Sequence, residues 1–191
     1  MTATNTREQI IVAADVLFYQ QGFDHTSFAN IAEAVNISRG NFYYHFKSKD
    51  QILSAVISLR RSNTHLMLKE WELSTERPER RLLNFIQILQ VNHDKILRYG
   101  CPVGTLTTEL LKLSHPASNE AKMIFTLFRT WLRRQFSEMG HKSDSDNLAM
   151  QLLIQSQGIA TLANAFNDAE FLNKQVSQLQ QWLDDLSTEM K

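Results

Sequence analysis

The chain has 191 residues, of which 43% are apolar, so it is large enough for a packed interior and too apolar for a disordered chain. Lysine and arginine number 20, as do aspartate and glutamate, which excludes a global basic field that would attract nucleic acid or a membrane. The single cysteine excludes an intrachain disulfide and suits a reducing compartment, and no run approaches the ~20 apolar residues that span a bilayer. We therefore expect a cytoplasmic protein with no membrane partner.

The first third of the chain contains four predicted helices. Thr6 and Gln9 have the spacing of a capping box before an apolar stripe, and Gly22 ends this first helix. A short second helix over about 27–35 and a third over about 38–45 are separated by a tight turn, and a long fourth helix follows. Two short helices joined by a brief turn and flanked by longer ones are the arrangement of a helix-turn-helix.

Helical signals continue through the rest of the chain, and no strand-like alternation occurs. Three prolines and six glycines leave long stretches without a breaker. Further helices are expected over about 78–100, 105–113, 116–140, 144–166 and 168–190. The chain is therefore predicted to be all-α with about nine helices, an N-terminal three-helix domain with the helix-turn-helix at 1–60 and a C-terminal helical domain at 61–191.

The third predicted helix combines an apolar side with a polar aromatic side. Phe42 and Phe46 are one turn apart and are expected to face inward, which turns the neighbouring polar residues outward. Arginine can pair with guanine and asparagine with adenine in the major groove, and a lysine in a first helical turn can approach a phosphate. Periodicity alone leaves an ordinary helical hairpin with exposed tyrosines as an alternative. The candidate DNA contacts are Thr26, Ser27, Ser38, Arg39, Gly40, Asn41, Tyr43, Tyr44, His45 and Lys49.

The segment TSFANIAEAVNISRGNFYYHFKSKDQIL closely resembles the helix-turn-helix signature of the TetR family of bacterial repressors. The matching elements are Thr26-Ser27, Ile31-Ala32, Val35, Ile37-Ser38, Gly40, Phe42 to Phe46 and Lys47-Ser48-Lys49. The resemblance covers about residues 6–60. It implies a homodimer that binds a palindromic operator in double-stranded DNA through residues 1–60. Residues 61–191 would then form an effector-binding and dimerisation domain, in which a small molecule causes release of the operator.

The last predicted helix has an apolar stripe with alternating spacings of four and three residues. Such spacing is typical of helices that pack in a left-handed sense. The preceding helix offers small residues that allow close approach, so the two helices of each subunit are expected to form a four-helix dimer interface. The alternative is that the stripe packs only on its own chain. The candidate interface residues are Ile159, Ala163, Phe166, Leu172, Val176, Leu179, Leu183 and Leu186.

An effector cavity follows from the resemblance, and its lining is predicted from an aromatic face between 116 and 140 and from a facing helix. Mostly apolar walls with a few polar groups are typical of ligand sites, although an ordinary helical core looks the same. The candidate lining residues are Phe85, Leu89, Asn92, Cys101, Phe125, Phe128 and Trp131.

Cys101 lies in a breaker-rich loop just before a predicted helix, where a thiol can be reactive. Related regulators with a cysteine here can sense electrophiles or oxidants, so a thiol-based sensing repressor is the alternative function. A small buried apolar residue is the other interpretation of this cysteine.

No sequence pattern indicates an enzyme. The chain has no HExxH and no CxxC motif, and the histidines at 65, 93, 115 and 141 lie on different predicted elements. We therefore predict no catalytic residues, no metal and no cofactor. A scaffold that does not bind DNA is the third class. Unlike a repressor, an enzyme or a scaffold would show no salt-dependent binding to duplex DNA.

Overall fold

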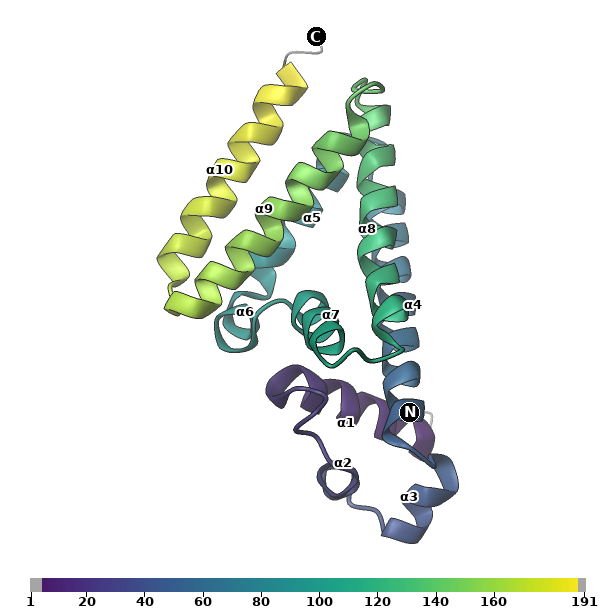
Figure 1. The fold of residues 1–191 in the computed structure, drawn as a ribbon. Coiled ribbons are helices and arrows are strands. Elements are labelled where there is room, and N and C mark those ends of the chain that lie inside the picture. The colour runs from purple at the N-terminus through teal and green to yellow at the C-terminus, as the bar shows by residue number, and fades with distance from the viewer. Residues whose placement is uncertain (1–4, 189–191) are drawn as a thin grey trace. The chain divides into compact units, whose positions relative to one another are not determined.

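The computed structural model describes residues 5–188, except for the side chain of Arg39. These residues form ten α-helices and no strand, which confirms the all-α prediction (Figure 1). The helices are α1 (Thr6–Gln21), α2 (Phe28–Ala34), α3 (Arg39–His45), α4 (Lys49–Ser74), α5 (Pro78–Val91), α6 (His93–Tyr99), α7 (Pro102–Lys112), α8 (Ser118–Glu138), α9 (Ser145–Phe166) and α10 (Ala169–Thr188). Within this described stretch, no helix has both the length and the apolar character that a bilayer crossing needs.

The chain divides into two compact units. The first unit contains the residues up to Asn63 together with Thr105–Ile124, and the second contains Thr64–Gly104 together with the residues from Phe125 onward. α4, α7 and α8 each contribute residues to both units. The functional division of the chain at residue 60 stays a prediction.

The first unit has a core to which α1 to α4 and α7 all contribute. α1 supplies Ile10, Ala14 and Phe18, and the two phenylalanines of α3 are also buried here. α7 adds Leu106 and Leu110 to the same core. The three-helix N-terminal bundle is therefore completed by a helix that lies far along the sequence.

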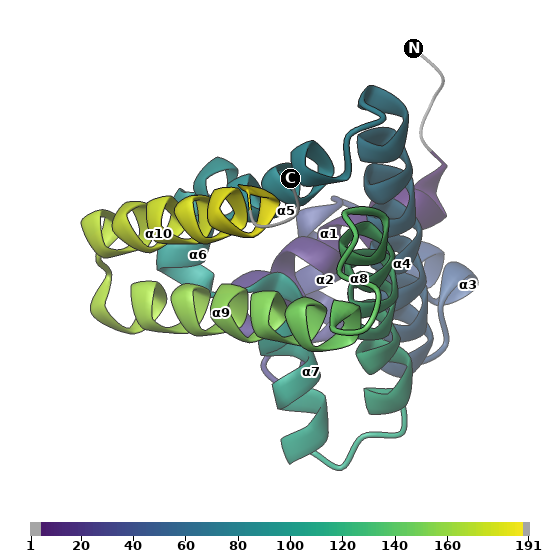
Figure 2. The ribbon, with the colours of Figure 1, turned by 90° about the horizontal axis from the view of Figure 1, so that it is seen from above.

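The second unit is built around α5, α9 and α10. α10 packs on α5 and on α9, and Figures 1 and 2 both show α9 and α10 side by side. The apolar stripe of α10 (Leu172, Val176, Leu179 and Leu183) lies in this core, which also contains Leu132 and Phe136 of α8.

The single helix predicted over 78–100 is two helices in the structure, so the described residues form ten helices where about nine were expected. α5 ends at Val91, and Asn92 separates it from α6. The side-chain amide of Asn92 and its backbone N–H both donate to the Ile88 carbonyl, at 2.9 and 3.1 Å. The side-chain amide thus shares the carbonyl that accepts the last regular helical bond, and such side-chain bonds to the backbone favour a helix end. α7 also begins earlier than predicted, because Pro102 is well suited to a first helical turn.

Candidate nucleic-acid interface

The turn between α2 and α3 is held by local hydrogen bonds. Ser27 caps α2 in a reciprocal capping box with Asn30, and Ser38 caps α3 by accepting from the Asn41 N–H at 3.3 Å. Between the helices, Asn36 has a φ of 53°, the left-handed conformation that asparagine tolerates. The short helices and the sharp turn are therefore consequences of the local sequence.

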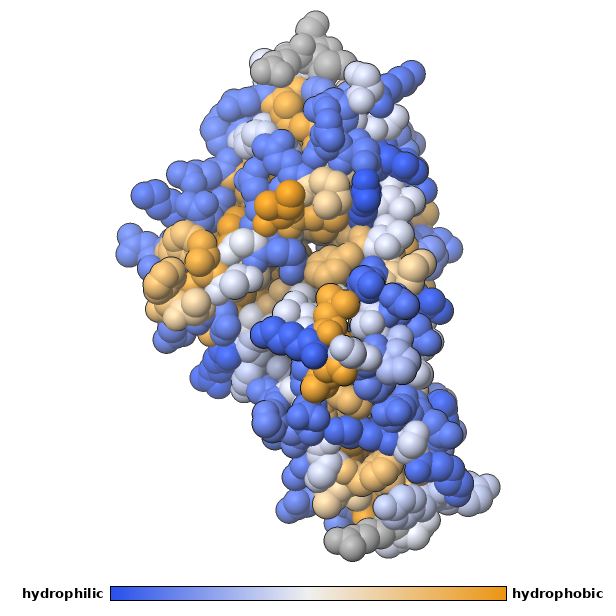
Figure 3. Space-filling view, in the orientation of Figure 1, coloured by the Kyte–Doolittle hydropathy of each residue, from blue (hydrophilic) through white to orange (hydrophobic). Residues whose placement is uncertain are grey.

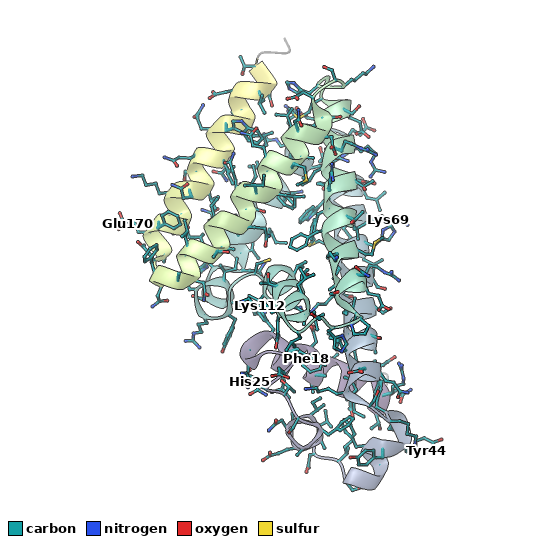
Figure 4. All side chains as sticks on the ribbon, in the orientation of Figure 1. Phe18, His25, Tyr44, Lys69, Lys112 and Glu170 are labelled. Carbon is teal, nitrogen blue, oxygen red and sulfur yellow. The ribbon has the colours of Figure 1, made fainter. Side chains whose placement is uncertain are left out.

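α3 is anchored from behind by its two phenylalanines. Phe42 and Phe46 are 1% and 2% exposed, and the Phe42 ring makes an edge contact with Phe28 at a centroid distance of 5.1 Å. On the opposite side, Tyr43 is 47% and Tyr44 78% exposed, and Figure 4 shows Tyr44 pointing away from the fold. The inward and outward faces of α3 are as predicted. A short helix with one buried and one polar aromatic face can enter the major groove.

Most of the predicted DNA contacts are accessible. The exposed residues are Ser27, Ser38, Gly40, Asn41, Tyr43 and Tyr44, and His45 is half-buried at the end of α3. Apart from its chain neighbours and the backbone of its own helix, no described heavy atom lies within 4 Å of the point where a Cβ on Gly40 would stand, so the backbone of α3 is open to close approach there. The side chain of Arg39 lies outside the described part of the chain. Contact of these residues with DNA stays a prediction.

Thr26 is a correction to the predicted contacts. Its side chain is 1% exposed, and its hydroxyl donates to the Gly22 carbonyl at 2.6 Å and accepts from the Gln21 side chain at 3.3 Å. Because the hydroxyl is buried and bonded inside the unit, it stabilises the loop before α2 and is not available to a phosphate.

Lys49 is bound to backbone groups of its own unit. Its Nζ donates to the carbonyls of Phe23 and Asp24, at 2.9 and 3.2 Å, and lies 4.2 Å from the centroid of the Phe23 ring. The ammonium group therefore binds the loop between α1 and α2, and contact of this half-buried lysine with a phosphate stays a prediction. The sequence could not distinguish these roles, because a lysine in the first turn of a helix suits a phosphate equally well.

The predicted effector residues lie mainly in the core of the second unit. Phe85, Leu89 and Trp131 are buried, and the rings of Phe85 and Phe128 are in edge contact at 5.6 Å. Phe125 and Phe128 are half-buried, as is Asn92, whose amide is bonded to Ile88 as described above. Cys101 is half-buried and accepts a hydrogen bond from the Gly104 N–H at 3.4 Å.

The second unit contains a different cavity, of about 650 Å³, formed by α4, α8 and the start of α9. Only Trp131 of the predicted lining residues belongs to it. Its remaining lining residues are mostly of charged or polar type and include Lys69, which Figure 4 labels. The lining residues are His65, Leu68, Lys69, Glu72, Leu127, Thr130, Trp131, Arg133, Arg134, Ser137, Glu138 and Ser145. The prediction missed this cavity because it followed aromatic faces, whereas most of the lining side chains are charged or polar.

The charges around this cavity are partly neutralised. Arg134 forms ion pairs with Glu72 and Glu138, and Glu138 also pairs with Arg81 at 2.8 Å. The buried indole nitrogen of Trp131 has no hydrogen-bond partner among the described residues. Because this nitrogen is buried, it is not offered to a ligand in the cavity.

The predicted dimer residues are, with one exception, part of the core of their own chain. Ile159, Ala163, Leu172, Val176, Leu179 and Leu183 are buried, and Leu186 packs against the same core. This corrects their assignment to an intersubunit surface, because α10 turns its regular stripe towards α5 and α9. Phe166 is the exception, with 72% of its surface exposed.

Other residues of α9 form an exposed apolar face. Ile154, Leu162 and Phe166 are 64%, 45% and 72% exposed, and Figure 3 shows apolar side chains gathered along α9 and at its C-terminal end. Gly158 lies one turn from both Ile154 and Leu162, and a Cβ there would meet nothing within 4 Å. We call Ile154, Gly158, Leu162 and Phe166 the α9 face. This face could not be predicted from the sequence, because its residues alternate with the residues that α9 buries.

Comparisons with known proteins agree with this geometry. Residues 10–56 match the family model "Bacterial regulatory proteins, tetR family". An uncharacterised HTH-type transcriptional regulator from the lacX 3' region of Lactococcus lactis is 29% identical over 172 residues, with 88% of both chains covered. The regulator TtgR of Pseudomonas putida is 42% identical over 65 residues, which cover 34% of this chain and 31% of TtgR. The crystal structure of a TetR transcriptional regulator from Legionella pneumophila superposes with a TM-score of 0.83 at 27% identity and covers 97% of this chain and 98% of that one.

Proposed function

Because the chain belongs to the TetR family of transcriptional regulators and carries the family's DNA-binding helix-turn-helix, we propose that it is a repressor that binds a palindromic operator as a dimer and is released by a small-molecule effector. The observation that carries this proposal is the two-sided α3, with buried Phe42 and Phe46 behind it and exposed Asn41, Tyr43 and Tyr44 in front.

Each exposed group on α3 has a partner in duplex DNA. Asn41 can pair with adenine, and Arg39 with guanine, in the major groove. The tyrosine hydroxyls can reach phosphates, and Ser27 and Ser38 stand at helix starts whose free amides attract phosphate. In this proposal base contacts come from α3 and orientation comes from the phosphate contacts around it.

The experiment that tests operator binding begins with selecting fragments bound by the protein from its host genome. Fluorescence anisotropy then measures affinity for a selected fragment at increasing salt. A repressor loses affinity steeply as salt rises, whereas an enzyme or a scaffold shows no such binding. Arg39→Ala should cost about 1–3 kcal/mol and relax base preference at one operator position. Binding that is independent of salt and of Arg39 would contradict the proposal.

Dimerisation is proposed through the α9 face, in place of the stripe on α10. Exposed apolar side chains that follow one face of a helix mark interaction sites, and Gly158 in their midst allows another helix to approach closely. A dimer is also what two half-sites of a palindrome require.

The dimer proposal is tested with Ile154→Asp, which places a charge in the α9 face. Leu73→Asp is the matched control, because Leu73 is a 78% exposed apolar residue on α4. Light scattering coupled to size exclusion should show a monomer for Ile154→Asp and a dimer for the control. Two dimers of equal stability would rule out the α9 face as the interface.

The effector site is proposed to be the cavity formed by α4, α8 and the start of α9. Leu68, Leu127 and Trp131 give it an apolar side, while Lys69 and Arg133 supply positive charge. This combination suits an organic anion with an apolar body. A ligand releases DNA only if it prefers the conformation that cannot bind the operator, and a coupling of ~1–3 kcal/mol weakens operator binding about five- to 150-fold.

Trp131 makes the effector proposal testable by fluorescence. Aromatic carboxylates that bind the cavity should change the emission and weaken operator binding, and Lys69→Ala should reduce both effects. Glu70→Ala, an exposed neighbour outside the cavity lining, should leave both unchanged. Ligands whose effects are unchanged in Lys69→Ala would place the effector elsewhere.

A second candidate function is thiol-based sensing through Cys101. The observation that favours it is the half-buried position of the sulfur at the start of α7, where the Gly104 N–H donates to it. A thiol-modifying reagent should then release the operator from the wild type and not from Cys101→Ser. Equal release from both proteins would end this hypothesis.

A further inference from the structure

The loop between α1 and α2 is bound by a carboxylate from α7. Glu109 Oε2 accepts from the backbone N–H of Phe23 at 3.0 Å, and Oε1 accepts from that of Asp24 at 2.9 Å. Two consecutive backbone N–H groups form a concavity that binds anions, and here the chain supplies the anion itself. Hydrogen bonds to an ionised acceptor are stronger than those between neutral groups.

A lysine binds the same two residues through their carbonyl oxygens. Lys49 donates to the carbonyls of Phe23 and Asp24 and also lies over the Phe23 ring. The backbone donors and acceptors of both residues are therefore bound by charged side chains, one from α7 and one from the start of α4. The Phe23 ring is 4% exposed and makes edge contacts with Phe18 and His115.

The loop is shaped to accept the carboxylate. Gly22 has a φ of 90°, and a Cβ at this position would stand 2.9 Å from Glu109 Oε1. Only glycine combines this backbone conformation with room for the carboxylate. The bound segment continues into the start of α2, because the Thr26 N–H donates to the Phe23 carbonyl at 3.2 Å and Ser27 caps the helix.

We infer that Glu109 is a positioning residue for DNA binding: it holds the loop between α1 and α2, and through that loop it sets where α2 begins and how α2 presents α3. The inference rests on the proposed operator binding. Glu109 lies outside residues 10–56, the segment that matches the family model. The helix-turn-helix of this protein therefore depends on a side chain from α7, whose first residues, Pro102 to Gly104, belong to the second unit.

The test compares Glu109→Ala and Glu109→Gln in the full chain, with Glu120→Ala as the matched control. Glu120 is an exposed glutamate of the same unit, on α8. Removing a negative charge should strengthen binding to any DNA if only net charge matters. Loss of positioning predicts the opposite for the operator. Glu109→Ala should weaken operator binding by about tenfold or more, because two hydrogen bonds to a charged group are lost. Glu109→Gln keeps one carbonyl oxygen and should lie between the alanine variant and the wild type.

Two further measurements separate positioning from a general loss of structure. Affinity for DNA without the operator should be unchanged or higher in both variants, so the ratio of specific to non-specific binding falls. Amide hydrogen exchange should accelerate at Phe23 and Asp24 in Glu109→Ala. If Glu109→Ala does not fold, Glu109→Gln decides, with circular dichroism as the check on its helix content.

The outcomes distinguish this inference from the proposed function. A wild-type protein that binds no operator overturns both. A wild type that binds its operator, with both Glu109 variants and Glu120→Ala binding equally well, overturns the positioning role alone. Unchanged exchange at Phe23 and Asp24 in Glu109→Ala would also overturn it.

Discussion

Phe42 and Tyr44 are two positions apart on α3, and their substitutions should affect different properties. Phe42→Ala should mainly lower stability, whereas Tyr44→Ala should mainly weaken operator binding. Phe42 is 1% exposed, so Phe42→Ala removes a whole buried ring together with its edge contact to Phe28. Large-to-small changes of this kind cost about 3–5 kcal/mol, a substantial part of the ~5–15 kcal/mol that stabilises a typical protein. Tyr44 is 78% exposed, and its replacement by alanine should change stability by less than about 0.5 kcal/mol.

DNA binding should respond in the reverse order. Tyr44→Ala removes a proposed phosphate or base contact and should weaken operator binding about three- to tenfold, the value of one net hydrogen bond. Phe42→Ala removes no proposed DNA contact. It should therefore bind the operator more tightly than Tyr44→Ala does, under conditions where the first unit stays folded.

Two assays separate the effects. Urea unfolding followed by circular dichroism gives the free energy of unfolding, and anisotropy with the operator gives the affinity. If the free energy of unfolding of Phe42→Ala is less than ~1 kcal/mol below that of the wild type, the inference that the phenylalanines anchor α3 is wrong. If Tyr44→Ala is as unstable as Phe42→Ala, the assignment of Tyr44 to the exposed face of α3 is wrong. If Tyr44→Ala binds the operator with full affinity, the proposed contact between Tyr44 and DNA is wrong.

Three further predictions concern charges and caps. Asp15→Ala should lower the free energy of unfolding in urea by about 2–3 kcal/mol, because Arg60 is only 9% exposed and its Nε lies 2.5 Å from the Asp15 carboxylate. Asp146→Ala breaks an exposed ion pair and should cost much less. Equal losses in the two variants would contradict the role of burial. The hydrogen bond and charge of Arg129 lower the pKa of Asp146. The pair therefore stabilises the fold at neutral pH, and its contribution disappears as pH falls through that lowered pKa. An NMR titration should show the pKa of Asp146 rising towards its ordinary value in Arg129→Gln, and an unchanged pKa would refute the pairing. Ser27→Ala should lower stability by about 1 kcal/mol through loss of the α2 cap, and a neutral effect in thermal unfolding would show that the cap contributes nothing.

The helix-turn-helix could be predicted because its signals are local. The serine caps of α2 and α3, the left-handed Asn36 and the spacing of Phe42 and Phe46 each act within a few residues. Hydrogen-bonding side chains and helical periodicity determine such features whatever lies around them.

The roles of Thr26, Lys49 and the α10 stripe could not be predicted in the same way. Each role depends on which residues from other parts of the chain come to lie next to these side chains in the folded protein. The stripe has the spacing of an interface, yet its leucines pack on α5 and α9 of the same chain. A heptad pattern specifies that a helix packs against helices, and it does not specify whose helices they are.

The amino-acid order alone determined that this protein is helical, where its helix-turn-helix lies and which side of α3 is apolar. Only the tertiary structure decided that α7 completes the core of the first unit, that Glu109 and Lys49 hold the same loop, and that α9 keeps an exposed apolar face. The physical reason is distance along the chain. Caps and periodicity act within one or two helical turns, whereas the Glu109 carboxylate and the amides that it binds are separated by 85 residues or more and meet only after the core has formed.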